Sequence, residues 1–84
     1  MEKMFDVQIR LPAANREYLV RLPAGMNTHV AAYLTAKALD DLSDGNFMHA
    51  KTCVLAWHED GRLLDPLKTI ADNCVLNGSR LLLI

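Results

Sequence analysis

The sequence predicts a two-layer α+β domain with a mixed sheet of four to five strands, one main helix packed across one face, and a short helix before the last strand. Three features support this prediction. Two runs of alternating apolar and polar residues open the chain, a stretch with helical periodicity follows, and further strand-like runs close it. With 84 residues the chain has room for one hydrophobic core, so we expect a single domain over residues 1–84.

The first two strands are predicted at residues 5–11 and 17–22, where apolar side chains recur at every second position. The expected buried side chains are Phe5, Val7, Ile9 and Leu11 in the first run and Tyr18, Val20 and Leu22 in the second. The loop between the runs contains Pro12 and Asn15, which favours a hairpin. Pro23 ends the second strand because proline cannot donate to the ladder.

A helix is expected from Val30 to about Leu42, with Asn27 or Thr28 as its cap. Its apolar stripe should face the core and consists of Ala31, Leu34, Thr35, Ala38, Leu39 and Leu42. The opposite face carries His29, Tyr33, Ala36 and Asp40. Alanine is frequent on the stripe, so the helix can approach a sheet closely. Residues 43–46 end the helix, because they include a glycine and an asparagine suited to a left-handed cap.

A third strand is predicted at residues 52–58, and the Asp-Gly sequence within residues 59–61 indicates a turn. A short fourth strand follows at residues 62–64. Thr69 and Asp72 have the spacing of a capping box, with aspartate in place of the usual glutamate, which predicts one turn of helix.

The last strand follows a turn at Asn77-Gly78 and is apolar at every position from Leu81 to Ile84. A strand of this kind is usually covered on both faces, or exposes one apolar face that a partner covers. We therefore expect it at the centre of the sheet, parallel to the first strand.

The composition argues against several classes of function. A net charge of −1 gives no bulk attraction to nucleic acid. No apolar run approaches the roughly 20 residues of a transmembrane helix. The first residues lack the apolar region of a signal peptide. We therefore expect a cytoplasmic protein that neither binds nucleic acid nor inserts into a membrane.

No motif for a cofactor, a metal or catalysis is present, so we expect no cofactor and no enzymatic activity. His29, His49 and His58 are scattered over the predicted elements, which argues against a metal site. Cys53 and His58 would point to opposite faces of one strand, so they could not act as nucleophile and base. Cys53 and Cys74 are expected to remain thiols rather than to form a disulfide.

Three aspartates, Asp40, Asp41 and Asp44, gather at the C-terminal end of the predicted helix. Negative charge there interacts unfavourably with the helix dipole. They form either a solvated face, which we favour, or a contact for a basic partner.

The open face of the sheet favours a binding function. If Leu81 and Leu83 join the core, their neighbours face outward and lie beside the outward side chains of the third strand. The predicted partner-binding patch consists of Val54, Ala56, His58, Leu82, Ile84 and Arg10. Monomers do expose scattered leucines, but adjacent aliphatic residues on paired strands are less easily explained in that way. Homodimerisation through the same face is another version of this hypothesis.

The closing segments, Asp60 to Leu64, Thr69 to Asp72 and Val75 to Leu81, resemble the end of the ubiquitin-like β-grasp family. The resemblance extends in pattern over nearly the whole chain. Within that family, residues 70–81 look most like the small YukD/EsaB-type proteins of bacterial type VII (WXG100) secretion systems, which share the Asn-Gly turn.

This resemblance implies a non-enzymatic protein-interaction module, an accessory or regulatory component of a type VII secretion system. Its protein partners would be cytosolic domains of the membrane components of that system. Conjugated members of the family end in Gly-Gly, whereas this chain ends in Leu83-Ile84, so we expect no conjugation. The alternative is a small non-catalytic β-grasp subunit of a multicomponent monooxygenase, which the closing segment fits less well.

Overall fold

The computed structural model describes residues 3–12, 15–42 and 53–84, with the backbone alone for residues 40–42. The expected helix end at residues 43–46, His49 and the first residue of the predicted third strand lie outside this range. In chain order the elements are β1 (Met4–Leu11), β2 (Arg16–Pro23), α1 (Thr28–Leu42), β3 (Leu55–Trp57) and β4 (Arg80–Leu83).

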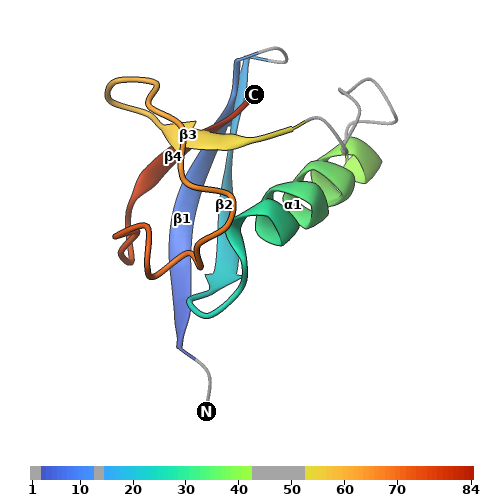
Figure 1. Ribbon diagram of the computed structural model, residues 1–84. Coiled ribbons are helices and arrows are strands. Elements are labelled where there is room, and N and C mark those ends of the chain that lie inside the picture. Colours follow the sequence, from blue (N-terminus) through green and yellow to red (C-terminus); the bar gives the residue numbers. More distant parts are fainter. Residues whose placement is uncertain (1–2, 13–14, 43–52) are drawn as a thin grey trace.

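The four strands form one mixed sheet in the order β2-β1-β4-β3 (Figure 1). β1 pairs antiparallel with β2, and β4 pairs antiparallel with β3. β1 and β4 are parallel, with Ile9 opposite Leu81. The predicted α+β class and the central position of the last strand are therefore confirmed. The closing strand is apolar because it has a neighbour on each side and a helix over one face.

The core lies between the sheet and α1, which crosses one side of the sheet (Figure 1). The alternation predicted for β1 is confirmed, because its four apolar side chains from Phe5 to Leu11 are all buried. Leu81 and Leu83 of β4 join them, and Trp57 packs half-buried against the same cluster. The polar positions of β1 point to the opposite face, which we call the open face.

Asn27 caps α1, because its side-chain oxygen accepts hydrogen bonds from the amides of His29 and Val30, at 2.9 and 3.3 Å. Half of the predicted core stripe, Ala31, Thr35 and Leu39, is buried as expected, but the buried side is rotated about the helix axis relative to the prediction. Leu34 and Ala38 are exposed, whereas Ala36, assigned to the outer face, is 0% exposed.

Small residues decide this rotation. The buried side of α1 consists of Thr28, Ala31, Ala32, Thr35, Ala36 and Leu39. Side chains this short let the helix backbone approach the sheet closely, and the two threonines among them are buried as well. The larger Val30 and Leu34 are left outside, with exposed fractions of 43% and 46%.

The predicted fourth strand at residues 62–64 is reduced to an isolated bridge between Ala56 and Leu63. The predicted turn before it is present, and Gly61 adopts the positive φ of 71° that this turn needs. The chain then turns away at Asp65, whose side-chain oxygen accepts a hydrogen bond from the amide of Leu67 at 2.9 Å. Pairing therefore stops after one bridge.

The predicted short helix is a single turn and forms no helix within the described residues. Its expected cap is present, because the Thr69 hydroxyl accepts a hydrogen bond from the Asp72 amide at 3.0 Å. The turn ends at Cys74, whose φ of 67° is left-handed and cannot continue a helix.

Asn73 fastens this turn to the start of α1. Its side-chain nitrogen donates to the Thr28 hydroxyl at 2.8 Å and to the carbonyl oxygens of Asp65 and Thr69 at 2.9 and 3.2 Å. Its side-chain oxygen accepts from the Asp65 amide at 2.9 Å. One side chain thereby holds the loop before β4 against the helix.

Candidate interaction surface

The open face of the sheet brings together the aliphatic residues that the sequence predicted as a patch. Arg10 on β1, Leu82 on β4 and Ala56 on β3 lie side by side in one row across three strands. Val54 and Ile84 form the adjacent pair, because each donates its amide to the carbonyl of the other, at 2.8 and 3.0 Å. The strand register therefore gathers these five residues at one corner of the sheet.

Exposure varies sharply within this group. Ile84 is exposed, and Val54 and Leu82 are half-buried. Ala56 is 0% exposed, so the expectation that its side chain contributes accessible surface is wrong. Its methyl group is short and lies between larger neighbours, so it forms the floor of the patch rather than part of its surface.

Leu63 belongs to this surface, although the sequence prediction omitted it. It is bridged to Ala56 on the side away from Leu82, and it is 58% exposed. Directly paired residues project to the same face of a sheet, so Leu63 extends the row outward. Adjacent side chains of a strand point to opposite faces, so burial of Leu64 in the core places its neighbour Leu63 on the open face. The open-face patch is accordingly defined as Val54, Leu63, Leu82 and Ile84 around Ala56.

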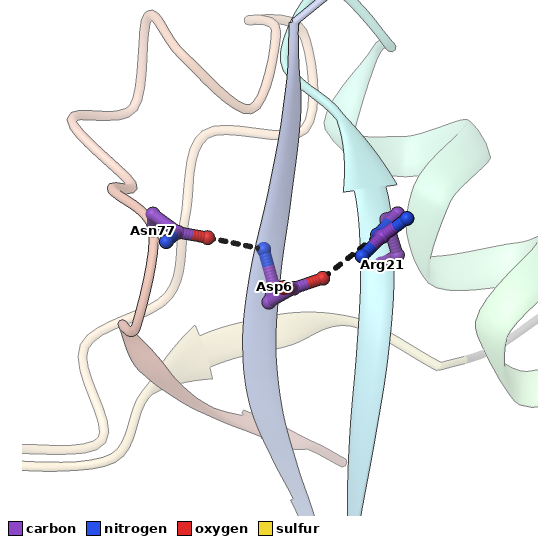
Figure 2. Close-up of polar contacts among 3 residues, drawn as sticks. All are labelled: Asp6, Arg21 and Asn77. Atoms are coloured by element: carbon purple, nitrogen blue, oxygen red, sulfur yellow. Dashed lines mark hydrogen bonds and ion pairs between the residues drawn. The ribbon is translucent and has the colours of Figure 1, made fainter.

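Beside the patch, the described part of the open face carries two ion pairs as well as the exposed Leu19. Arg80 on β4 reaches Glu17 on β2 at 3.6 Å, across the intervening strand β1. Arg21 donates from Nε to a carboxylate oxygen of Asp6 at 2.9 Å (Figure 2). This hydrogen bond is the main reason why the pKa of Asp6 lies below its usual value, with a further contribution from the guanidinium charge.

Asp6 also ties β1 to the turn before β4. Figure 2 shows the Asn77 side chain accepting a hydrogen bond from the Asp6 amide, at 2.7 Å. The Asp6 carbonyl in turn accepts from the amide of Gly78, also at 2.7 Å. The Asn-Gly turn that the sequence indicated therefore sets where β4 begins against β1.

Arg10 lies directly beside the open-face patch, opposite Leu82. Its guanidinium donates a hydrogen bond to the side-chain oxygen of Asn15 at 2.8 Å. Because Asn15 is uncharged, this contact does not neutralise the positive charge of Arg10. His58 is half-buried and donates its amide to the Arg80 carbonyl at 3.2 Å, at the far end of β3. The patch therefore has a cation at its edge on the β1 side.

A small cavity of about 70 Å³ lies between the first turns of α1 and the edge of β3. Its lining is mainly apolar and includes Cys53, and Val54 and Leu63 connect it to the open-face patch. Burial raises the pKa of the Cys53 thiol, which keeps the thiol protonated near neutral pH and makes it a poor nucleophile. Cys74 is exposed, and no disulfide joins the two cysteines.

Over residues 3–12, 15–42 and 53–84, no three histidine, cysteine, aspartate or glutamate side chains cluster closely enough to hold a metal ion. His29 lies exposed on the first turn of α1 and His58 lies in the turn after β3, so the two described histidines lie in different parts of the fold. In the same part of the chain, no helix has both the length and the hydropathy needed to cross a bilayer.

This arrangement of strands and helix is the ubiquitin-like β-grasp fold. The ubiquitin-like domain of EccD5 from Mycobacterium xenopi is similar to this chain, with a TM-score of 0.81 and 23% identity over 98% of this chain and 93% of that one. The ubiquitin-like domain of the type VII secretion protein EccD1 from Mycobacterium tuberculosis has a TM-score of 0.74 and 18% identity, with 98% of each chain covered.

A chain of the ESX-5 inner membrane complex, in its state without MycP5, contains a similar domain, with a TM-score of 0.78 and 17% identity. The similarity covers 96% of this chain but 20% of that one, so the fold there is part of a longer chain. No protein-family model and no curated protein matches the sequence. At these identities the structural likeness establishes the fold alone.

Proposed function

We propose that this protein is a non-catalytic, ubiquitin-like interaction module of a type VII secretion system. The likeness to the ubiquitin-like domains of EccD5 and EccD1 supports the association with this class of machine. More specifically, we propose that the protein is an accessory or regulatory component of the YukD/EsaB type. Its partners are the cytosolic parts of membrane components of the same system.

The observation that carries the proposal is the open-face patch beside Arg10. Leu63 and Ile84 are exposed there, and Leu82 and Val54 are half-buried around the floor made by Ala56. Adjacent exposed aliphatic side chains on a monomer are typical of a protein-binding surface. The partially buried members are already ordered by the sheet, so little side-chain entropy is lost when a partner covers them.

The charge at the edge of the patch defines the chemistry of the partner. Arg10 lies opposite Leu82 in the same row of the sheet, and its guanidinium donates a hydrogen bond to the uncharged side chain of Asn15. A guanidinium binds a carboxylate through two parallel hydrogen bonds. The matching surface is therefore an aliphatic segment flanked by an aspartate or glutamate that reaches Arg10.

The test is affinity purification from the source cells in mild detergent, followed by mass spectrometry, with wild type and Leu82→Asp side by side. Leu19→Asp is the matched control, because Leu19 is a 72% exposed leucine on β2, separated from β4 by β1. We expect secretion-system proteins with wild type and Leu19→Asp, and their loss with Leu82→Asp.

Two results would overturn the proposal in different ways. Recovery of a diiron hydroxylase by wild type would assign the protein to a multicomponent monooxygenase instead. Recovery of secretion-system proteins by all three forms would keep the class of machine and reject the open-face patch as the contact surface.

A further inference from the structure

β2 forms one edge of the sheet, and within the described parts of the chain no further strand lies beyond it (Figure 1). Its eight residues pair with β1 in an unbroken register, so the free edge is long and regular. Proteins often protect such an edge with a short strand, a bulge, a lysine or a proline. β2 has neither a bulge nor a lysine, and its proline, Pro23, is its last residue. β3, at the other edge, is short and is bridged by Leu63.

The backbone groups at the free edge of β2 belong to Glu17, Leu19 and Arg21. The Asp6 amide and carbonyl bond to the turn before β4 rather than to Arg21, the partner of Asp6 on β2 (Figure 2). In an antiparallel pair, residues that bond to the partner strand alternate with residues that do not. Arg21 and every second residue before it therefore direct their N–H and C=O groups away from β1. Pro23 is next in this series and has no N–H to offer, so the usable edge ends there.

We propose that this edge pairs with the same edge of a second copy of the protein, antiparallel and centred on Leu19, so that the two sheets become one. In this register Leu19 faces its own counterpart, and Glu17 of each copy faces Arg21 of the other. At each of these positions the facing residues exchange both of their backbone hydrogen bonds. A two-fold symmetric interface needs a surface that complements itself. β2 provides one, because Glu17 and Arg21 are equally spaced on either side of Leu19.

The charges of the neighbouring strands fit the same register. Glu17 lies opposite Arg10 of β1, and Arg21 lies opposite Asp6. Pairing of the two copies joins these residues into one row across the open face, in which Arg10, Glu17, Arg21 and Asp6 alternate in sign. Opposite charges that face each other across paired strands are stabilising. Because Glu17 and Arg21 complement each other across the axis, we assign a second copy to this edge rather than an extended segment of another protein.

Apolar contacts accompany this pairing on both faces of the sheet. Leu19 is 72% exposed in the single chain and would meet its counterpart at the centre of the open face. On the core face, Tyr18 of each copy would lie opposite Val20 of the other. Both side chains are half-buried against the core, so their remaining surface is available to each other. Contact between aromatic and β-branched residues on paired strands is favourable.

Pairing through β2 leaves the open-face patch accessible, because the patch lies over β3 and β4, on the other side of β1. One copy can therefore bind a second copy while its patch binds another protein. A homodimer formed through the open face, as the sequence alone suggested, would instead cover the patch. Leu19→Asp places two carboxylates at the centre of the β2 pair, so it should weaken self-association and keep the partner of the patch.

Sedimentation equilibrium of the purified chain from micromolar to millimolar concentration tests the proposal. We expect the weight-average mass of wild type to rise toward twice the monomer mass. Leu19→Pro should weaken association by about tenfold or more, because the central N–H donors are lost. That N–H faces away from β1, so the variant should fold, which circular dichroism verifies. Leu82→Asp is the control and should associate as wild type does.

Two results of this experiment would overturn the proposal. One is unchanged association of folded Leu19→Pro. The other is a wild type that stays monomeric at millimolar concentration, which would leave the edge of β2 to an extended segment of another protein.

A second experiment tests the register through its charges. Glu17→Arg and Arg21→Glu should each associate about tenfold more weakly than wild type, because like charges then face each other at both ends of the pair. An equimolar mixture of the two variants should regain association, since every facing pair in the mixed dimer is again opposite in charge. Adding Leu19→Pro to the Glu17→Arg variant should abolish this recovery, which distinguishes strand pairing from general attraction between unlike charges. A mixture that associates no better than its components would reject the register centred on Leu19.

Discussion

Ala56 on β3 and Leu82 on β4 are directly paired on the open face of the sheet, yet Ala56 is fully buried while Leu82 keeps part of its surface exposed. The difference follows from side-chain length. The Ala56 methyl group lies between Leu82 and Leu63, which project past it. Position on an outward-facing row therefore does not by itself make a residue accessible.

The pair predicts responses of different size to the same substitution. Ala56→Asp should lower the free energy of unfolding by roughly 3 kcal/mol or more, because it buries a carboxylate without a partner. Leu82→Asp should lower it by about 1 kcal/mol or less, since the side chain reaches solvent. Urea denaturation of both variants measures the difference. Equal losses would show that the two positions share the same environment.

Asn73 should be among the most sensitive polar positions in the described part of the chain. Asn73→Ala removes four hydrogen bonds, one to the Thr28 hydroxyl of α1 and three to backbone groups of Asp65 and Thr69 within the loop. We expect a loss of about 2–3 kcal/mol in unfolding free energy, because Thr28 and the loop carbonyls lose their partner.

Ser79→Ala is the control for this experiment. It removes a single hydrogen bond, from the Leu76 amide to the Ser79 hydroxyl, and should lower the unfolding free energy by about 1 kcal/mol or less. A smaller loss for Asn73→Ala than for Ser79→Ala would contradict the role assigned to Asn73.

Asp6 should contribute to the pH dependence of stability. The Arg21 hydrogen bond lowers the pKa of Asp6 from the ordinary 3.8, so the folded state favours the charged form. This contribution is fully present above pH 3.8 and is lost as the pH falls below 3.8 through the folded-state pKa. The loss should be small, because both side chains are largely exposed.

Denaturation curves measured from neutral pH down to strong acid test this assignment. Asp6→Asn should reduce the loss of stability in that acidic range, and Arg21→Gln should do the same because it removes the main cause of the shift. An unchanged acid dependence in both variants would show that the Asp6–Arg21 contact does not persist in solution.

The rotation of α1 can be checked by a pair of substitutions that the sequence pattern would rank the other way. Ala36→Leu should lower the unfolding free energy by about 1–3 kcal/mol, because it forces a larger side chain against the sheet. Leu34→Gln should change it by about 0.5 kcal/mol or less, because the Leu34 side chain is exposed. The reverse ranking would restore the stripe predicted from periodicity.

Strand positions were predictable because the alternation of apolar and polar residues that indicates a strand lies within a few consecutive residues. The alternation in residues 5–11 reflects the two faces of β1, and each apolar residue proved to be buried. The Asp-Gly and Asn-Gly turns were equally readable, since Gly61 and Gly78 adopt the positive φ that such turns need. Asn27 was one of two residues predicted as the cap, and its side chain accepts the capping hydrogen bonds.

The rotation of α1 was not predictable in the same way. Alanine, valine and leucine all count as apolar, so Leu34 and Ala36 are distinguished by size rather than by hydropathy. Size matters only when a sheet lies at a fixed distance, and that distance depends on strands from both ends of the chain. The exposure of Val30 and Leu34 on α1 was therefore hidden from the sequence pattern.

The open-face patch shows both what the local sequence pattern predicts and what it misses. The sequence by itself determined which residues alternate outward on the closing strand and that this strand is central, because strand periodicity and a continuous apolar run are local properties. The sequence also placed Arg10 beside the patch. Only the tertiary structure decided that Leu63 pairs with Ala56 and that Ala56 becomes the floor of the patch. These facts depend on the register between segments far apart in the chain, which is set by packing of the whole sheet against α1 rather than by any one segment.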